Sequence, residues 1–191
     1  MKIKHLPLAL ALAMACGAAN AAQLKLSGGT AIEHDSDMGD QPVLNLNAAL
    51  HPDDTPLMLR ATVLEGMQAG GPQTQEQDAG VGLTETAGPW TAEVGAEVGH
   101  TRMADAGQAA SVDHFAGTFR GVYAMSSDVA LTAIAKLGRA NGFAGDLYAA
   151  TGLGVRVAHV DAGTVSVDAM AVRDGALPRR ALLGVSYILA F

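Results

Sequence analysis

Hydrophobic and polar residues alternate with a period of two along most of this chain, and this pattern constrains the fold more than any other feature. It is clearest at the end of the sequence, where one alternating set reads Ala181, Leu183, Val185, Tyr187, Leu189 and Phe191. A period of two places these side chains on one face of a β-strand, whereas a helix would spread them around its axis. An apolar face that continues to the last residue indicates an apolar medium outside the strand.

Ten segments carry the alternation, and the fourth of them is the weakest. They span residues 23–33, 43–51, 57–64, 78–85, 90–101, 112–125, 129–139, 147–159, 164–173 and 181–191. Longer and shorter intervals alternate between them, which is typical of an up-and-down barrel with long loops on one rim and tight turns on the other. We therefore expect an all-β fold, a transmembrane up-and-down antiparallel β-barrel of ten strands, or of eight if the fourth segment and one neighbour are loop.

The composition favours strands over helices as the membrane-crossing elements. Hydrophobic residues make up 49% of the chain, but after residue 21 no stretch reaches the roughly 18 consecutive apolar residues of a transmembrane helix. In lipid every backbone N–H and C=O group needs a protein partner, so a sheet that crosses a membrane has to close on itself.

The first 21 residues resemble an export signal. Lys2 and Lys4 precede an apolar run over residues 6–15, and Ala19-Asn20-Ala21 fits the A-x-A cleavage pattern of a secretory signal peptide. We expect residues 1–21 to be removed and residues 22–191 to form the barrel, with lipidation of Cys16 as the alternative. Removal leaves ten basic and 19 acidic residues and no cysteine. An acidic exported chain is a poor partner for nucleic acid.

Nine charged residues of the alternating segments fall on the polar faces. The cations are Lys25, Arg60, Arg120, Lys136 and Arg156, and the anions are Glu33, Glu93, Glu97 and Asp168. An unpaired charge inside a barrel is costly, so nearly balanced signs predict a lumen network of ion pairs and hydrogen bonds. Glu93 and Glu97 share one strand face, and Arg120 on the next segment is the expected cation between them.

The ending "Y-x-L-x-F", together with the signal peptide and the alternating strands, resembles small Gram-negative outer-membrane β-barrel proteins. A further resemblance, to YfaZ-type outer-membrane proteins, rests on chain size and on the "PLM" of residues 56–58. The resemblance implies that Phe191, Leu189, Tyr187 and Val185 form the signal that the barrel-assembly machinery reads. It also implies a place in the outer membrane among lipid and lipopolysaccharide.

Aromatic residues are expected at the two membrane interfaces, although they make up only 4% of the chain. The periplasmic belt would hold Trp90, Tyr123, Tyr187 and Phe191, and the outer belt Phe115, Phe143 and Tyr148.

No catalytic residue, metal ligand or cofactor is predicted. His34, His100 and His114 fall near the expected outer rim with Asp35, Asp37, Asp105 and Asp113 close in sequence, but no His-x-x-x-His or Cys spacing accompanies them. Solvated loop residues are the favoured interpretation. The segment "DSDMGD", residues 35–40, departs from the calcium-loop pattern in the place of its glycine and lacks the closing glutamate.

Three functions follow from this interpretation. The leading hypothesis is a structural or surface-interaction barrel with a plugged lumen, because the interior charges nearly balance. The alternative is a narrow, porin-like passive pore for small solutes or ions. An enzyme at the outer rim is the third, and the absence of catalytic motifs counts against it.

Overall fold

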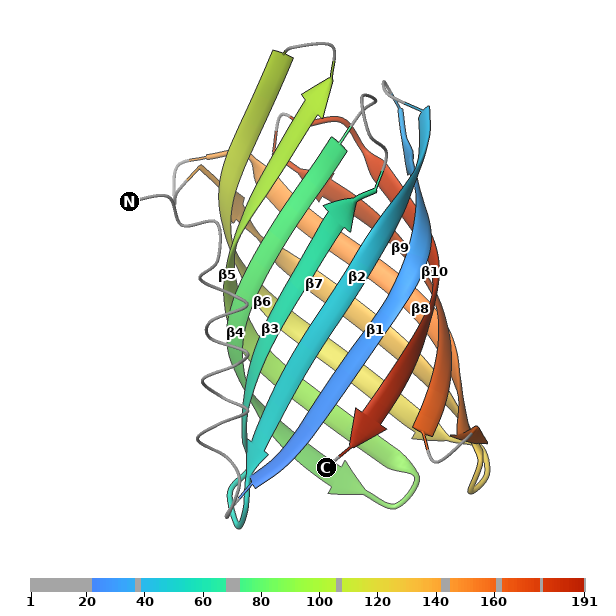
Figure 1. Ribbon diagram of the computed structural model, residues 1–191. Helices are drawn as coiled ribbons and strands as arrows, with labels where there is room; N and C mark the ends of the chain where they lie inside the picture. The colour runs from blue at the N-terminus through green and yellow to red at the C-terminus, as the bar shows by residue number, and fades with distance from the viewer. Residues whose placement is uncertain are drawn as a thin grey trace.

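The computed structural model of the protein is a closed barrel of antiparallel strands (Figure 1). It describes residues 22–36, 39–67, 73–105, 108–141, 145–160, 163–175 and 177–190. The predicted signal peptide, the lipidation candidate Cys16 and the terminal Phe191 lie outside the described residues. Within the described ranges no helix has the length and apolar character needed to cross a membrane.

Ten strands build the wall, and each pairs with its neighbours in sequence. They are β1 (Ala22–Asp35), β2 (Gly39–Pro52), β3 (Leu57–Gly66), β4 (Gln73–Ala87), β5 (Trp90–Asp105), β6 (Gln108–Ala124), β7 (Val129–Ala140), β8 (Leu147–Val160), β9 (Gly163–Asp174) and β10 (Arg180–Ala190). Pairing of β1 with β10 closes the sheet and leaves the wall without an edge. The prediction of ten strands is confirmed, and the weak fourth segment is a full strand of 15 residues.

Both ends of the barrel sequence lie at one end of the molecule. Lys25 near the start of β1 is paired with Ala190 at the end of β10, and Asp35 is paired with Arg180 at the opposite end. We call the end that holds Lys25 and Ala190 proximal and the opposite end distal. The proximal end carries tight turns over residues 53–56, 88–89 and 125–128, and the β4–β5 turn uses Gly88 at φ 58°.

The distal connections are shorter than predicted, because the strands continue where loops were expected. Residues 33–42, 65–78 and 100–113 were expected to be long loops, yet β1, β2, β4, β5 and β6 run through most of these ranges. Their outward positions there are polar, as at Gln75, Gln77, His100 and Asp113, so the contrast between the two faces disappears from the sequence. The β5–β6 hairpin rises above the rest of the distal rim (Figure 1).

The outer wall of the barrel is apolar over its middle. Its exposed residues include Val81, Leu83, Val94, Val98, Phe115, Phe119, Leu137, Leu153, Val167, Leu183 and Val185. Leu153 is 70% exposed and Leu137 is 66% exposed. Soluble proteins rarely leave an apolar surface of this extent open to water.

The interior differs between the two ends. The distal half is packed, and its buried side chains include Val43, Leu64, Met103, Val112, Tyr148, Val172 and Leu182. The registers place these residues on the inward face of their strands. The proximal half encloses a cavity of about 340 Å³, which we call the proximal cavity. The polar side chains inside the barrel therefore lie in two different surroundings, a packed distal half and a hollow proximal half.

Candidate functional site

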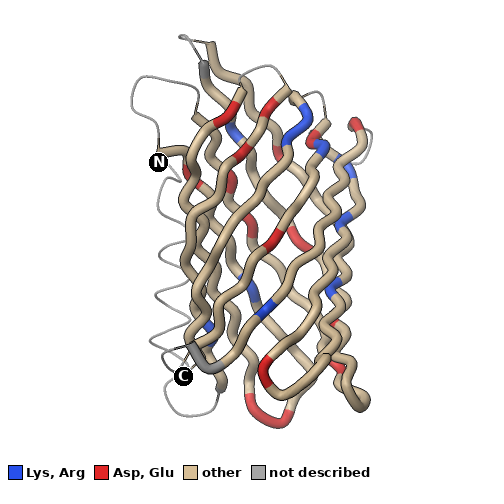
Figure 2. Tube along the Cα trace, turned by 90° about the vertical axis from the view of Figure 1, so that its right-hand side faces the viewer, with Lys and Arg blue, Asp and Glu red and all other residues tan. Residues whose placement is uncertain are grey.

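Charged residues gather inside the packed distal half of the barrel. We call them the distal cluster: Glu33, Asp35, Glu76, Asp78, Glu97, His114, Lys136, Asp174 and Arg180. All are buried except Lys136, whose side chain is 10% exposed. Figure 2 shows acidic positions on several strands in this upper half of the wall. Six carboxyl groups therefore share one enclosed space with one lysine, one arginine and one histidine.

Arg180 connects β10 to the opposite part of the wall. Its Nη2 atom lies 2.6 Å from Oε2 of Glu76 on β4, and its guanidinium also lies 3.9 Å from carboxylate oxygens of Glu33 and Asp174. The Arg180 side chain is fully buried. A buried guanidinium is tolerated only beside anions, so this group of carboxylates holds Arg180 across the lumen.

Neutral side chains complete the network around Glu33. The Thr74 hydroxyl donates to Oε1 of Glu33 at 2.8 Å. The Gln41 amide donates to the Thr74 hydroxyl at 2.8 Å and to Glu33 at 3.4 Å. These contacts join β1, β2 and β4 inside the packed distal half.

Lys136 forms the second cross-lumen connection. Its Nζ atom lies 2.7 Å from Oε1 of Glu97 and 3.2 Å from Oδ2 of Asp78. Lys136 comes from β7, whereas the two carboxylates come from β5 and β4. The ammonium group therefore ties non-adjacent strands together at the boundary between the packed half and the proximal cavity.

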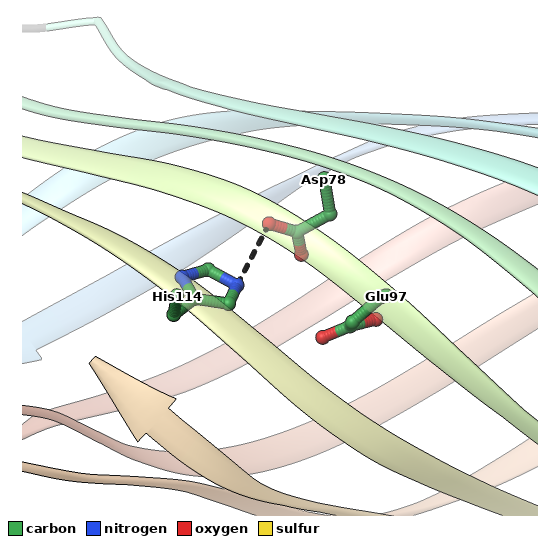
Figure 3. A group of neighbouring side chains, drawn as sticks. All are labelled: Asp78, Glu97 and His114. Carbon is green, nitrogen blue, oxygen red and sulfur yellow. Dashed lines mark ion pairs between the residues drawn. The ribbon is translucent and has the colours of Figure 1, made fainter. Parts of the chain in front are cut away.

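His114 lies beside this pair of carboxylates (Figure 3). Its Nε2 atom is 3.3 Å from Oδ1 of Asp78, and its Nδ1 atom is 3.9 Å from Oδ2 of Asp174. The ring stacks on Tyr148 with centroids 4.0 Å apart and an interplanar angle of 5°. Neither ring nitrogen has a hydrogen-bond partner among the described residues. Ligand atoms of Asp78, Glu97 and His114 lie within 4.8 Å of one another, close enough to converge on a cation.

The proximal cavity is lined by a different set of charges. Arg60 pairs with Glu93 at 2.7 Å, and Asp168 accepts hydrogen bonds from Ser166 at 2.6 Å and Thr132 at 3.4 Å. Lys25, Arg120 and Arg156 also line the cavity. Apart from the members of the distal cluster that also reach the cavity, cations outnumber anions around its wall, whereas carboxylates outnumber cations in the distal cluster.

The nine residues of the predicted lumen network all occupy inward positions in the register. The structure brings together Arg60 with Glu93 and Lys136 with Glu97. Arg120 is paired in register with Glu93, but among the described residues no ion pair joins it to Glu93 or Glu97. Glu93 is therefore paired with Arg60 and Glu97 with Lys136, whereas Arg120 was the expected partner of both.

Several members of the distal cluster were missed by sequence reasoning. Glu76 and Asp174 fell in or beside expected loops, and Arg180 fell in the interval before the last segment. The only available signal was parity, because each keeps the period-two spacing of the inward residues on its strand. His114 was expected near the rim and is instead inside the barrel.

Tyr148 was placed in the outer aromatic belt, and this assignment is wrong. Its side chain is 0% exposed, and its ring stacks on that of His114 inside the lumen. Tyr148 has the same parity on β8 as the inward residue Arg156, so it belongs to the inward face of the strand. By contrast, Trp90 and Tyr123 meet on the outward face of the proximal end, with ring centroids 4.6 Å apart. Phe143 lies outside the described residues.

The remaining histidines of the rim lie on the outer surface. His34 pairs with Asp40 at 2.6 Å, and His100 pairs with Asp113 at 2.6 Å. Asp37 lies outside the described residues. Of the expected assembly signal, Val185 and Leu189 are exposed on the outer wall, and its role as a signal stays a prediction.

The ten-stranded wall, apolar outside and polar inside, defines a transmembrane up-and-down β-barrel. No family model matches the chain, and no curated protein matches it. Solved structures similar to it include the β-domain of the Bordetella autotransporter BrkA, with 14% identity and a TM-score of 0.45 over 90% of this chain and 100% of that one.

Two further similar structures come from Neisseria. The translocator domain of the autotransporter NalP from Neisseria meningitidis has 9% identity and a TM-score of 0.46 over 96% of this chain and 94% of that one. Neisserial surface protein A has 10% identity and a TM-score of 0.39 over 89% and 97%. These matches do not confirm the resemblance to YfaZ-type proteins, and at these values they assign no function.

Proposed function

We propose that this protein is an outer-membrane β-barrel with a plugged, non-conducting lumen and a structural or surface-interaction role. The observation that carries the proposal is the ion pair between Arg180 and Glu76, which crosses a distal half already filled by buried side chains. A plug of this kind blocks solute passage without a separate plug domain, because the side chains of the wall supply it.

The outer membrane is the proposed location because the wall suits lipid and the chain carries a predicted export signal. Exposed leucines and valines cover the middle of the wall, and an outward apolar band is the feature by which such barrels sit in lipid. Membrane lipid, lipopolysaccharide and the barrel-assembly machinery are the proposed partners. Fractionation of cells that express the full chain tests the location, and recovery in the soluble periplasm would contradict it.

Conductance measurements in planar bilayers test the plug. We expect no steady single-channel current from the parent barrel. Arg180→Ala, which leaves Glu76 without its cation, is expected to open brief current events. Steady current from the parent at all potentials would overturn the plugged lumen.

A narrow passive pore is the second candidate, and the proximal cavity is the observation that favours it. The cavity reaches to Lys136, Asp78 and Glu97 at the base of the distal cluster. If the parent conducts and Lys136→Met changes its ion selectivity, the pore function replaces the plug.

A further inference from the structure

We propose that Asp78, Glu97 and His114 bind a divalent transition-metal ion of the zinc type inside the barrel. The inference goes beyond the proposed function, because it gives the distal cluster a ligand whether or not the lumen conducts.

The three side chains converge from adjacent strands. Asp78 is on β4, Glu97 on β5 and His114 on β6, and one ligand atom from each lies within 4.8 Å of the other two. Zn²⁺ binds imidazole nitrogen and carboxylate oxygen at about 2.0–2.2 Å, which requires ligand atoms roughly 3.3 Å apart. The Asp78–His114 distance of 3.3 Å already meets this requirement. The Glu97 oxygen lies within 4.8 Å of the other two ligand atoms, so it has to move by up to about 1.5 Å to reach the same spacing.

The surroundings of His114 match those of a metal-ligating imidazole. Such a histidine usually presents its other nitrogen to a carboxylate or carbonyl, which fixes the ring and its tautomer. Here Nε2 faces Asp78 and Nδ1 faces Asp174 at 3.9 Å. Stacking on Tyr148 fixes the plane of the ring. His114 is 4% exposed, and neither nitrogen has a hydrogen-bond partner among the described residues. The buried Nε2 atom that faces Asp78 is therefore available as a metal ligand.

Gly99 leaves the space in which the ligands meet. It is paired in register with Asp78 on one side and with His114 on the other. A Cβ atom at this position would collide with Oδ1 of Asp78 and Nε2 of His114, the two atoms that face each other. Absence of a side chain at residue 99 is therefore a condition for this convergence.

The charges of the distal cluster favour a bound cation. Its six carboxyl groups share this space with two permanently charged members of the cluster, Lys136 and Arg180. Excess buried negative charge is costly unless a proton or a cation compensates it. Lys136 bridges Asp78 and Glu97, so it competes with the metal for the same two carboxylates.

An ion can reach the site from the proximal end. Asp78, Glu97 and Lys136 line the proximal cavity, which has a volume of about 340 Å³. His114 lies behind them, further into the packed half. The carboxylates are thus the first ligands that an entering cation meets, and the imidazole completes the coordination.

The test measures metal binding to the full chain extracted from membranes in detergent and stripped with a chelator. Zn²⁺ is titrated by calorimetry, and Co²⁺ is added separately because its visible absorption reports coordination by nitrogen. We expect one ion per barrel. Glu97→Gln and His114→Ala are each expected to weaken binding at least tenfold, Asp174→Asn by about 10- to 100-fold, and Gly99→Ala is expected to abolish it.

His100→Ala is the matched control, because it removes a histidine–aspartate pair from the outer surface of β5 and β6, the strands that carry Glu97 and His114. It is expected to leave the stoichiometry and affinity unchanged. Lys136→Met removes the competing ammonium group, and it tests the site even where a ligand variant fails to fold. Zn²⁺ should bind to the Lys136→Met variant more tightly than to the parent. Zn²⁺ should also raise the unfolding temperature of this variant by more than it raises that of the parent. The proposal is overturned if the parent binds no Zn²⁺, or if the control and the ligand variants bind equally.

Discussion

Arg180 and Glu76 are separated by 104 positions in the sequence, yet their side chains form an ion pair of 2.6 Å inside the barrel. The pair joins β10 to β4, which are not neighbours in the sheet. Contacts of this kind restrain the cross-section of the barrel in a way that hydrogen bonds between adjacent strands do not.

Arg180→Met is expected to lower the free energy of unfolding by about 3–5 kcal/mol, because it leaves buried carboxylates without their cation. Urea unfolding in lipid vesicles measures the change. Arg179→Met is the control, because Arg179 is exposed at the rim, and it should alter stability little. Equal unfolding midpoints for the two variants would show that the Arg180 pair is not a source of stability.

The Arg60–Glu93 pair should contribute less than the Arg180–Glu76 pair. Its side chains are 20% and 12% exposed to the proximal cavity, so water screens their attraction. A double-mutant cycle with Arg60→Met and Glu93→Gln is expected to give a coupling of about 1 kcal/mol, near the range of exposed pairs. A coupling larger than that between Arg180 and Glu76 would contradict the assignment of the cavity as hydrated.

Val185 and Ser186 test the two faces of β10. Val185 is 53% exposed on the outer wall, whereas Ser186 lines the proximal cavity. Val185→Arg is expected to cost about 2–4 kcal/mol of folding free energy in lipid. Ser186→Arg should cost clearly less, because the cavity offers water to the guanidinium. Folding titrations into vesicles compare them, and the reverse order would invert the assigned faces.

Tyr148 separates the effect of a hydroxyl from that of an aromatic ring. Its hydroxyl is buried without a hydrogen-bond partner among the described residues, so Tyr148→Phe should leave the barrel as stable as the parent or slightly more stable. Tyr148→Ala should cost about 3–5 kcal/mol by leaving a cavity beside His114. Chemical unfolding of both variants checks this, and a large loss for Tyr148→Phe would reveal a role for the hydroxyl.

Removal of Phe191 tests the predicted assembly signal. Cells that express the shortened chain should accumulate less membrane-inserted barrel and more unfolded chain, because the assembly machinery would lack the last aromatic of its signal. Heat-dependent migration of outer-membrane extracts in gels measures the inserted fraction. Normal levels of inserted barrel would remove Phe191 from the signal.

The sequence allowed the wall to be predicted better than the interior. Period-two contrast located β2, β3 and β7 because their outward residues are apolar and their inward ones polar. The same criterion failed for the start of β4, where outward Gln75 and inward Glu76 are both polar, so Glu76 of the distal cluster was assigned to a loop. Partners across the lumen depend on strand tilt and side-chain length, which explains why Lys136 rather than Arg120 is the partner of Glu97.

The raised β5–β6 hairpin has a consequence for the distal rim. Residues 108–113 of β6 are paired with β5, whereas within the described ranges the pairing of β6 with β7 begins only at His114 and Ala140, with Asn141 N donating to the Asp113 carbonyl. Within the described ranges, a barrel that is closed through its wall therefore ends in a short strand edge at residues 108–112. A strand added to such an edge would be bound through its main chain, which depends little on the side chains displayed there.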